Sequence, residues 1–310
     1  MRHIKEIVRQ LWGIPQMQWS LSQQLKHEAN KGICQFRRDY LIDHILHDSE
    51  PGITNIKYGD CEIIVSLTTY GRRLHEAAFA IESIMQQTLK ANRIILWLSH
   101  EDYKSIPFNL KLLEKRGLEI MECDDLLSYK KIIPTIIRYP NDVIITIDDD
   151  VYYDFDILEH LITAYQNNPD FIHCNRAHRM TFYQTGELKP YMEWDWYVEN
   201  NGPDKLNFFT GCGGVLYPPH CLDDEVLDKS VFMDICRFAD DVWLNAMALK
   251  KGTLVNKVFT RNLNGEDFLD NGNVQDTALN KINTMGEKLN DIQIEAVFTK
   301  YNLYGRLSQK

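Results

Sequence analysis

The chain has 310 residues, of which 44% are hydrophobic and 25% charged. This composition excludes a disordered or collagen-like chain and predicts a sizeable core. The 34 Lys+Arg and 44 Asp+Glu give a net charge of −10, which argues against a partner bound mainly through nucleic-acid phosphates. Seven cysteines without a Cys-x-x-Cys pair indicate reduced thiols in a cytosolic protein.

The amino-terminal residues are basic but lack the apolar core and cleavage site of a secretory signal. No run of about 18 apolar residues occurs, so a membrane-spanning helix is not expected. A helix lying on a membrane surface is compatible with the sequence. We therefore expect a cytoplasmic protein, and peripheral contact with the inner face of the cytoplasmic membrane remains open.

The first predicted unit is a helical N-terminal extension over residues 1–60, where apolar side chains recur at helical spacing until Pro51-Gly52. Short β-branched runs then alternate with helical stretches. The predicted strands cover residues 61–67, 93–98, 118–121 and 143–147, and the predicted helices cover residues 74–87, 108–115 and 131–138. This alternation predicts an α/β fold with a mostly parallel sheet flanked by helices, an architecture with nucleotide-binding potential.

The regular alternation ends near residue 150. Further helices are predicted over residues 157–165, 240–249 and 292–301. An irregular aromatic stretch over residues 191–197 separates the first two of them. We assign the main domain to residues 61–250 and a C-terminal tail that packs on it to residues 251–310.

Three consecutive carboxylates, Asp148, Asp149 and Asp150, directly follow the predicted strand 143–147. Ligands of open parallel sheets bind at the carboxyl ends of the strands, so this position suits a substrate. Adjacent carboxylates repel one another, and oxygen ligands favour hard divalent ions such as Mg²⁺ or Mn²⁺. An acidic turn that caps the next helix is the alternative interpretation.

Two more motifs follow along the chain. Residues 210–214 (TGCGG) let the backbone pass close to another group, either in a tight turn that enters a strand or beside a substrate. Asp240 and Asp241 open an amphipathic helix. The helix macrodipole alone favours acids at this end, but a carboxylate here can also act as a general base.

The loop after the first strand supplies further candidate ligands. Thr68, Thr69 and Arg72 lie at the carboxyl end of that strand, where hydroxyls and a guanidinium can contact a nucleotide. For Arg72, an ordinary exposed charge is the alternative interpretation.

Over about residues 61–250 the order of these motifs resembles nucleotide-sugar glycosyltransferases of the GT-A fold, both family 2-like bacterial enzymes and β-1,3-galactosyltransferase-like enzymes. The Asp-x-Asp motif of that family matches Asp148 to Asp150. The resemblance implies that Asp148 and Asp150 ligate Mn²⁺ or Mg²⁺ at the donor diphosphate, with Asp149 beside the donor. It also implies an inverting transfer with Asp241 as base and Asp240 as its neighbour.

The resemblance further implies where the substrates bind. Asp125 and Lys130, after the third strand, would contact a nucleoside diphosphate sugar, with a UDP-sugar as the expected donor. A saccharide or lipid-linked saccharide acceptor would contact the aromatic stretch and the glycine turn at Trp194, Asp195, Trp196, Gly213 and Gly214. One departure is that many relatives supply a later histidine as a metal ligand, whereas no histidine follows His220 here.

Three functional hypotheses therefore stand side by side. The first is a metal-dependent transfer of a sugar in cell-surface glycan synthesis, which releases free nucleoside diphosphate. The second is a metal-dependent nucleotidyltransferase or phosphohydrolase that uses the same strand-end carboxylates, and nucleotidyl transfer releases pyrophosphate instead. The third is a non-catalytic carbohydrate-binding protein on a degenerate GT-A fold, which binds sugar or nucleotide without turnover. No nucleic-acid partner is expected from any of them.

Overall fold

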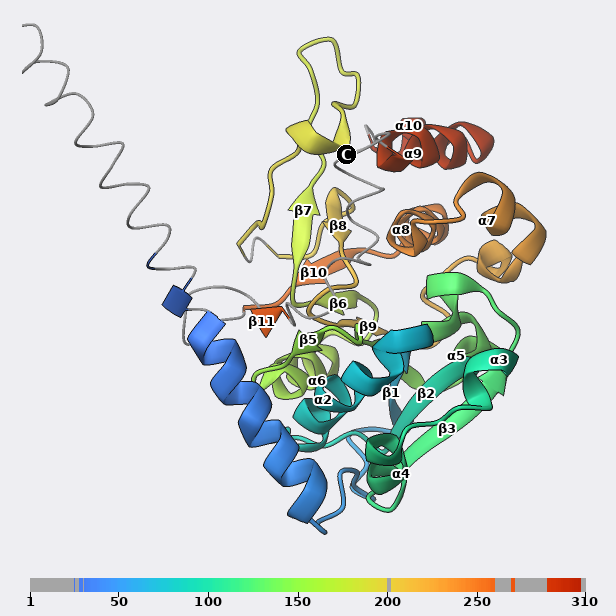
Figure 1. Cartoon of the computed structure of the whole chain (residues 1–310). Coiled ribbons are helices and arrows are strands. Elements are labelled where there is room, and N and C mark those ends of the chain that lie inside the picture. Colours follow the sequence, from blue (N-terminus) through green and yellow to red (C-terminus); the bar gives the residue numbers. More distant parts are fainter. Residues whose placement is uncertain are drawn as a thin grey trace, which may run out of the picture.

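A computed structural model describes residues 31–199, 202–259, 269–270 and 289–307, together with residues 25, 28 and 29. In the predicted N-terminal extension, residues 31–47 form a helix, which lies along one side of the molecule near α2 (Leu74–Met85) (Figure 1). Arg38 fixes this helix by pairing with Glu76 of α2. Residues 1–24 of the extension and residues 260–268 and 271–288 of the tail lie outside the described part.

The central element is a seven-stranded sheet with the order β10-β6-β9-β4-β1-β2-β3 (Figure 1). Neighbouring strands are parallel except at β9, which runs antiparallel to β4 and β6. The strands are β1 (Ile63–Thr68), β2 (Arg93–Ser99), β3 (Leu118–Cys123), β4 (Val143–Thr146), β6 (Ile172–Cys174), β9 (Val215–Tyr217) and β10 (Val255–Lys257). The predicted α/β class and mostly parallel sheet are confirmed, and β10 continues the sheet past residue 250.

Two small antiparallel pairs accompany the main sheet. They are β5 (Val151–Tyr152) with β11 (Leu269–Asp270), and β7 (Ala177–Arg179) with β8 (Asn207–Phe209). The β7–β8 pair stands above the β6 and β10 side of the main sheet (Figure 1). It therefore adds a wall next to one half of the sheet only.

Helices cover both faces of the sheet. One face packs against the helix over residues 31–47 and against α2, α4 (Phe108–Glu114) and α6 (Ile157–Asn167). The other packs against α5 (Ile133–Arg138), α7 (Lys229–Ile235), α8 (Asp240–Lys251) and α9 (Leu289–Lys300). The remaining helical turns are α3 (His100–Tyr103), α10 (Tyr304–Leu307), η1 (Gly71–Arg73), η2 (Leu127–Lys131), η3 (Tyr191–Glu193) and η4 (Asp224–Leu227).

Strand β1 shows why both faces must be covered. Ile63, Val65 and Leu67 point into the apolar cluster that contains α2, whereas Ile64 packs against Ile95 on the opposite face. Side chains of a strand alternate between the two faces. A strand that carries apolar side chains on both faces is therefore stable only when both faces are buried.

The predicted helix over residues 131–138 differs from the observed structure. Its start is displaced, because η2 ends at Lys131 and α5 begins at Ile133, with Pro134 in the first turn. Proline is favoured there because the first helical N–H groups have no intrahelical acceptor. Lys130 and Lys131 consequently lie in a tight 3₁₀ turn. The other predicted helices and strands agree with the observed bounds to within a few residues.

Candidate active site

A cavity of about 600 Å³ opens at the carboxyl ends of β1 and β4. Residues far apart in the sequence contribute to its wall, within 68–73, 125–131, 147–150, 208–212 and 237–242, together with Arg176, Tyr191, Tyr197 and Asn290. A second cavity of about 590 Å³, lined by residues such as Lys205, Tyr301 and Arg306, has no carboxylate in its wall. The carboxyl-end cavity is therefore the one that can support acid–base or metal chemistry.

The acidic segment after β4 is held by cations from two directions. Lys131 Nζ lies 3.0 Å from Asp148 Oδ1. Arg73 pairs with both Asp149 and Asp150, and the Thr69 hydroxyl donates to Asp149 Oδ2 at 2.5 Å. Both oxygens of Asp149 are thus occupied within the protein, whereas the Asp148 side chain is 28% exposed.

The three carboxylates differ in how well they are neutralised. Burial opposes ionisation of Asp148, but the Lys131 ammonium outweighs it and lowers the pKa of that carboxyl. Burial, followed by repulsion from Asp148 and Asp149, raises the pKa of Asp150 to about 7, because Arg73 offsets only part of it. The segment therefore has more negative charge than its protein cations compensate, which fits a divalent cation.

A metal ion needs several ligand atoms that lie close to one another. Across the described ranges, the one group of three carboxylate, imidazole or thiol ligands with mutually close atoms is His44, Asp48 and Glu82. Arg116 already occupies that cluster, with Nη1 2.5 Å from Glu82 and Nη2 2.9 Å from Asp48. Its guanidinium takes the place a cation would need. A cation at Asp148 and Asp150 would have to complete its ligands from a substrate.

The second acidic pair lies in the same cavity. Asp240 Oδ2 is 2.9 Å from Lys131 Nζ, and Asp241 Oδ1 accepts a hydrogen bond from the Gly211 N–H at 3.0 Å. Burial, followed by repulsion from Asp240, raises the pKa of Asp241 to about 7, and Lys131 offsets part of this effect. One buried ammonium therefore bridges the carboxylates after β4 and those that begin α8.

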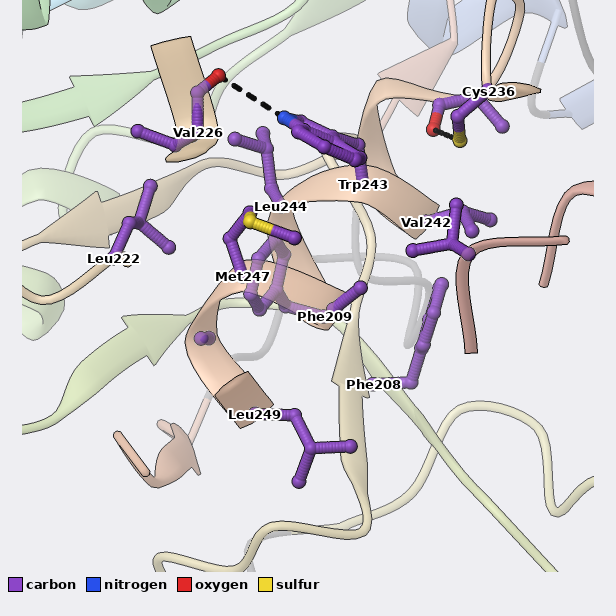
Figure 2. Packing of buried hydrophobic residues seen from close by; sticks show 14 of the residues in the cluster. Phe208, Phe209, Leu222, Val226, Cys236, Val242, Trp243, Leu244, Met247 and Leu249 are labelled. Carbon is purple, nitrogen blue, oxygen red and sulfur yellow. Dashed lines mark hydrogen bonds between the residues drawn. The ribbon is translucent and has the colours of Figure 1, made fainter. Parts of the chain in front are cut away.

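The start of α8 is rigidly placed by apolar packing (Figure 2). Trp243 is completely buried, packs among Phe209, Val226 and Met247 of the same apolar cluster, and donates from Nε1 to the Val226 carbonyl at 3.1 Å. A large ring in the second turn of the helix fixes the direction of its first turn. Packing thus determines where the Asp240 and Asp241 carboxylates point.

The glycine turn acts mainly through Gly211. A Cβ at this position would lie 2.7 Å from Lys131 Nζ and 3.1 Å from Asp241 Oδ1, so any larger residue here would displace these two charged groups. Gly213 and Gly214 have φ values of +96° and +95°, and the Gly213 carbonyl accepts from Asn175 Nδ2 at 2.7 Å. These two predicted acceptor ligands shape the turn and do not line the cavity, whereas Thr210 and Cys212 do.

Most predicted donor-side residues line the cavity, but Thr69, which is buried beside Asp149, and Arg72 do not. Thr68 lines the cavity, although its hydroxyl donates to the Trp97 carbonyl at 2.8 Å. Asp125 and Lys130 also line it and pair with each other at 2.8 Å. The predicted Arg72 side chain is exposed outside the cavity, and its neighbour Arg73 takes the inward position. The 3₁₀ turn η1 decides which of the two arginines points inward.

The predicted aromatic wall differs from the observed one. Trp194 is 4% exposed and donates from Nε1 to the Lys189 carbonyl, so it belongs to the core. Trp196 stacks on His178 with 4.6 Å between ring centroids, and Asp195 is exposed. None of these three residues lines the cavity. The aromatic residues that do are Tyr70, Tyr191, Tyr197, Phe208 and Phe238.

Sequence reasoning did not find four cations that line the cavity, Arg73, Lys131, Arg176 and Arg237. Each lies in a turn or loop, and two of them directly follow another basic residue, so by sequence alone they look like ordinary solvated charges. Lys131 could have been suspected, because the five carboxylates of the two acidic motifs need a buried counter-charge if they share one cavity.

Comparison with known protein families found no family model that matches the chain, and a search of curated proteins found no match. Within the described segments, no helix is both long and apolar enough to cross a membrane. The functional argument therefore depends on the geometry and chemistry of the cavity.

Proposed function

We propose that this chain is a metal-dependent glycosyltransferase of the GT-A fold, which transfers a sugar from a nucleoside diphosphate sugar to a saccharide acceptor with inversion. One observation carries the proposal: Lys131 bridges Asp148 and Asp240, so two acidic pairs from separate motifs face one cavity. Sugar transfer needs acidic groups at two points, at the departing diphosphate and at the attacking hydroxyl. Nucleotidyl transfer, the alternative, does not require the second pair.

The donor belongs on the β1–β3 side of the cavity in this proposal. Thr68 and Arg73 follow β1, and Asp125 and Lys130 follow β3. Hydroxyl, carboxylate and cationic groups at the ends of parallel strands are suited to a nucleoside diphosphate. A UDP-sugar is the first donor to test.

Asp241 is the proposed general base. A base works best when its pKa is close to the working pH, and burial beside Asp240 gives Asp241 a pKa of about 7. The Gly211 N–H holds Oδ1, so Oδ2 can take the proton of the acceptor hydroxyl as that oxygen attacks the anomeric carbon. Asp240, which pairs with Lys131, would help to hold Asp241 in position.

Asp148 and Asp150 would hold the divalent cation, Mn²⁺ or Mg²⁺. When bound, the cation would stabilise negative charge on the departing diphosphate as a Lewis acid. The incomplete neutralisation of Asp150 supports this assignment. Arg73 and Lys131 position the two carboxylates, and Arg73 also keeps Asp149 turned toward β1.

Product analysis tests the proposal directly. The purified chain is incubated with Mn²⁺, a panel of nucleoside diphosphate sugars and saccharide acceptors, and the released nucleotide is identified. Free nucleoside diphosphate supports sugar transfer, pyrophosphate would establish nucleotidyl transfer, and binding without turnover would establish a carbohydrate-binding protein. Asp241→Asn should abolish transfer and retain donor binding, while Asp195→Asn, an exposed position outside the cavity, is the matched control. Loss of donor binding in Asp241→Asn would move this residue to the metal site.

The biological setting follows from the same proposal. An enzyme that extends a saccharide or lipid-linked saccharide for a cell-surface glycan would work in the cytoplasm, at the inner face of the cytoplasmic membrane. Membrane association would then be peripheral. Fractionation of cells that produce the chain, with and without a high-salt wash, distinguishes a peripheral from a freely soluble protein.

A further inference from the structure

Two cations of the cavity wall, Arg176 and Arg237, have no ion pair among the described residues, and of these Arg176 is partly buried whereas Arg237 is exposed. Arg73 pairs with Asp149 and Asp150, Lys131 pairs with Asp148 and Asp240, and Lys130 pairs with Asp125, all at the cavity wall. Arg176 also lines the cavity. Among the residues that the structure describes, no carboxylate lies within ion-pair distance of its guanidinium.

The protein nevertheless fixes the Arg176 side chain in place. Its Nε donates to the Thr210 hydroxyl at 2.6 Å, and its guanidinium lies 5.6 Å from the centroid of the Tyr197 ring. The Arg176 carbonyl accepts from the Thr210 N–H at 3.2 Å. These contacts use one nitrogen and one face of the guanidinium, and they leave the two terminal nitrogens for a ligand. Such a fixed fork matches the geometry of carboxylate and phosphate groups.

The position of Arg176 separates it from the donor diphosphate. It connects β6 to β7, on the half of the sheet where the β7–β8 wall stands (Figure 1). The groups that would hold the nucleoside diphosphate follow β1 and β3, on the other side of β4 in the strand order. Thr210, which holds Arg176, is followed by Gly211, whose N–H holds the proposed base Asp241. Arg176 is thus connected to the base and to the acceptor half.

We propose that Arg176 forms an anion subsite on the acceptor half, and that the saccharide acceptor carries a carboxylate or a phosphate group near the hydroxyl that is glycosylated. This inference rests on the proposed glycosyltransferase function and adds the chemical class of the acceptor. The anion balances the unpaired guanidinium, while the Tyr197 ring, already beneath Arg176, offers an apolar face to the sugar. An uncharged acceptor would leave a partly buried cation without a partner.

Ligand-observed NMR at millimolar sugar concentration tests the subsite without turnover. The probes are glucuronate, glucose 6-phosphate and uncharged glucose, and the protein is the full chain in its wild-type, Arg176→Gln, Arg176→Lys and Arg72→Gln forms. Arg72 is the control because it is exposed and outside the cavity. We expect at least one anionic sugar to bind about 10- to 100-fold more tightly than glucose, because a charge-assisted hydrogen bond typically contributes this much to affinity. The preferred probe distinguishes a carboxylate from a phosphate.

The variants decide the assignment. Arg176→Gln should abolish the preference, Arg176→Lys should retain part of it, and Arg72→Gln should retain all of it. Equal binding of all three sugars by the wild type, or an unchanged preference in Arg176→Gln, would overturn the inference. Donor affinity with Mn²⁺ is measured on the same proteins. If Arg176→Gln weakens UDP binding instead, Arg176 contacts the donor diphosphate and only the inference about the acceptor fails. If anionic sugars bind but no nucleoside diphosphate sugar does, the proposed glycosyltransferase function fails instead.

Discussion

Lys131 is the most informative residue to perturb, because one ammonium serves two acidic pairs. Its Nζ lies 3.0 Å from Asp148 Oδ1 and 2.9 Å from Asp240 Oδ2, and the side chain is almost fully buried. Lys131→Met preserves most of the aliphatic stem and removes the charge. The neighbouring Lys130→Met is a matched control, because Lys130 is equally buried but its partner Asp125 has a side chain that is 59% exposed.

The expected magnitudes follow from what each substitution leaves behind. Removing one partner of a buried ion pair costs about 3–5 kcal/mol, since an uncompensated charge remains in the interior. The lower end is expected here, because the Asp148 side chain is 28% exposed. Lys130→Met leaves Asp125 in contact with water and should cost about 0–1 kcal/mol. The two adjacent lysines should therefore differ by roughly 3 kcal/mol in the free energy of unfolding.

Urea unfolding followed by tryptophan fluorescence measures this difference, and its pH dependence tests the cause. In the wild type the pKa of Asp148 is lowered, so its pairing stabilises the folded state above the unfolded pKa and the contribution is lost as the pH falls. Without Lys131, burial raises the pKa of Asp148 above its unfolded value, so the variant should regain stability relative to wild type as the pH falls toward the unfolded pKa. Equal losses in both variants, or a pH-independent loss in Lys131→Met, would refute the electrostatic role.

Three further predictions concern single residues. Asp241→Asn should stabilise the protein by about 1–3 kcal/mol at pH 8, because burial raises the pKa of Asp241 to about 7 and this destabilises the folded state wherever the unfolded carboxyl is ionised; the gain should shrink as the pH falls from 8 to 5 and disappear only below about pH 4, where the carboxyl is protonated in both states. A gain that does not shrink between pH 8 and pH 5 would contradict this. Gly211→Ala should reduce the rate of transfer at least tenfold by displacing Lys131 and Asp241. Gly59→Ala is the control, because a Cβ there has open space, and it should leave the rate unchanged. Equal rates for the two variants would exclude a steric role of Gly211. Trp194→Phe should lower the urea midpoint of unfolding without changing the KM for the acceptor, because Trp194 packs in the core. A rise in that KM without a lower urea midpoint would show instead that Trp194 contacts the acceptor.

The fold was predictable because its signals are local and repeated. In β1 four of the five positions from Ile63 to Leu67 are apolar and the fifth, Ser66, is also buried, which is typical of a strand covered on both faces. The reversed direction of β9 was not predictable, since Val215–Tyr217 is only three residues long and strand direction depends on the path of the connecting chain. Pro134 shows the same limit at finer scale: it moved the start of α5 and so decided that Lys131 faces the cavity.

The carboxylates of the site were predictable and their partners were not. Asp148 and Asp150 were expected at the carboxyl end of a strand, the resemblance to GT-A glycosyltransferases implied that Asp241 belongs to the same site, and all three line the cavity. Which of two adjacent basic residues turns inward depends on one turn of backbone, so sequence reasoning selected Lys130 rather than Lys131 as the central lysine. The predicted acceptor wall over residues 191–197 was wrong at Trp194 for a related reason: the sequence alone does not distinguish an aromatic residue in the core from one that lines a cavity.

Uncompensated negative charge and uncompensated positive charge lie at different places in the cavity. The excess negative charge lies at the end of β4, where Asp150 is incompletely neutralised, whereas a partly buried positive charge without an ion pair lies at Arg176, next to the β7–β8 wall. A protein stabilised only by mutual pairing would bring such opposite charges together. Keeping them apart costs folding free energy at both places. The cost is recovered when a cation binds at one end and an anion at the other, so an anionic acceptor and a metal-bound donor should each raise the thermal midpoint, and their effects should add.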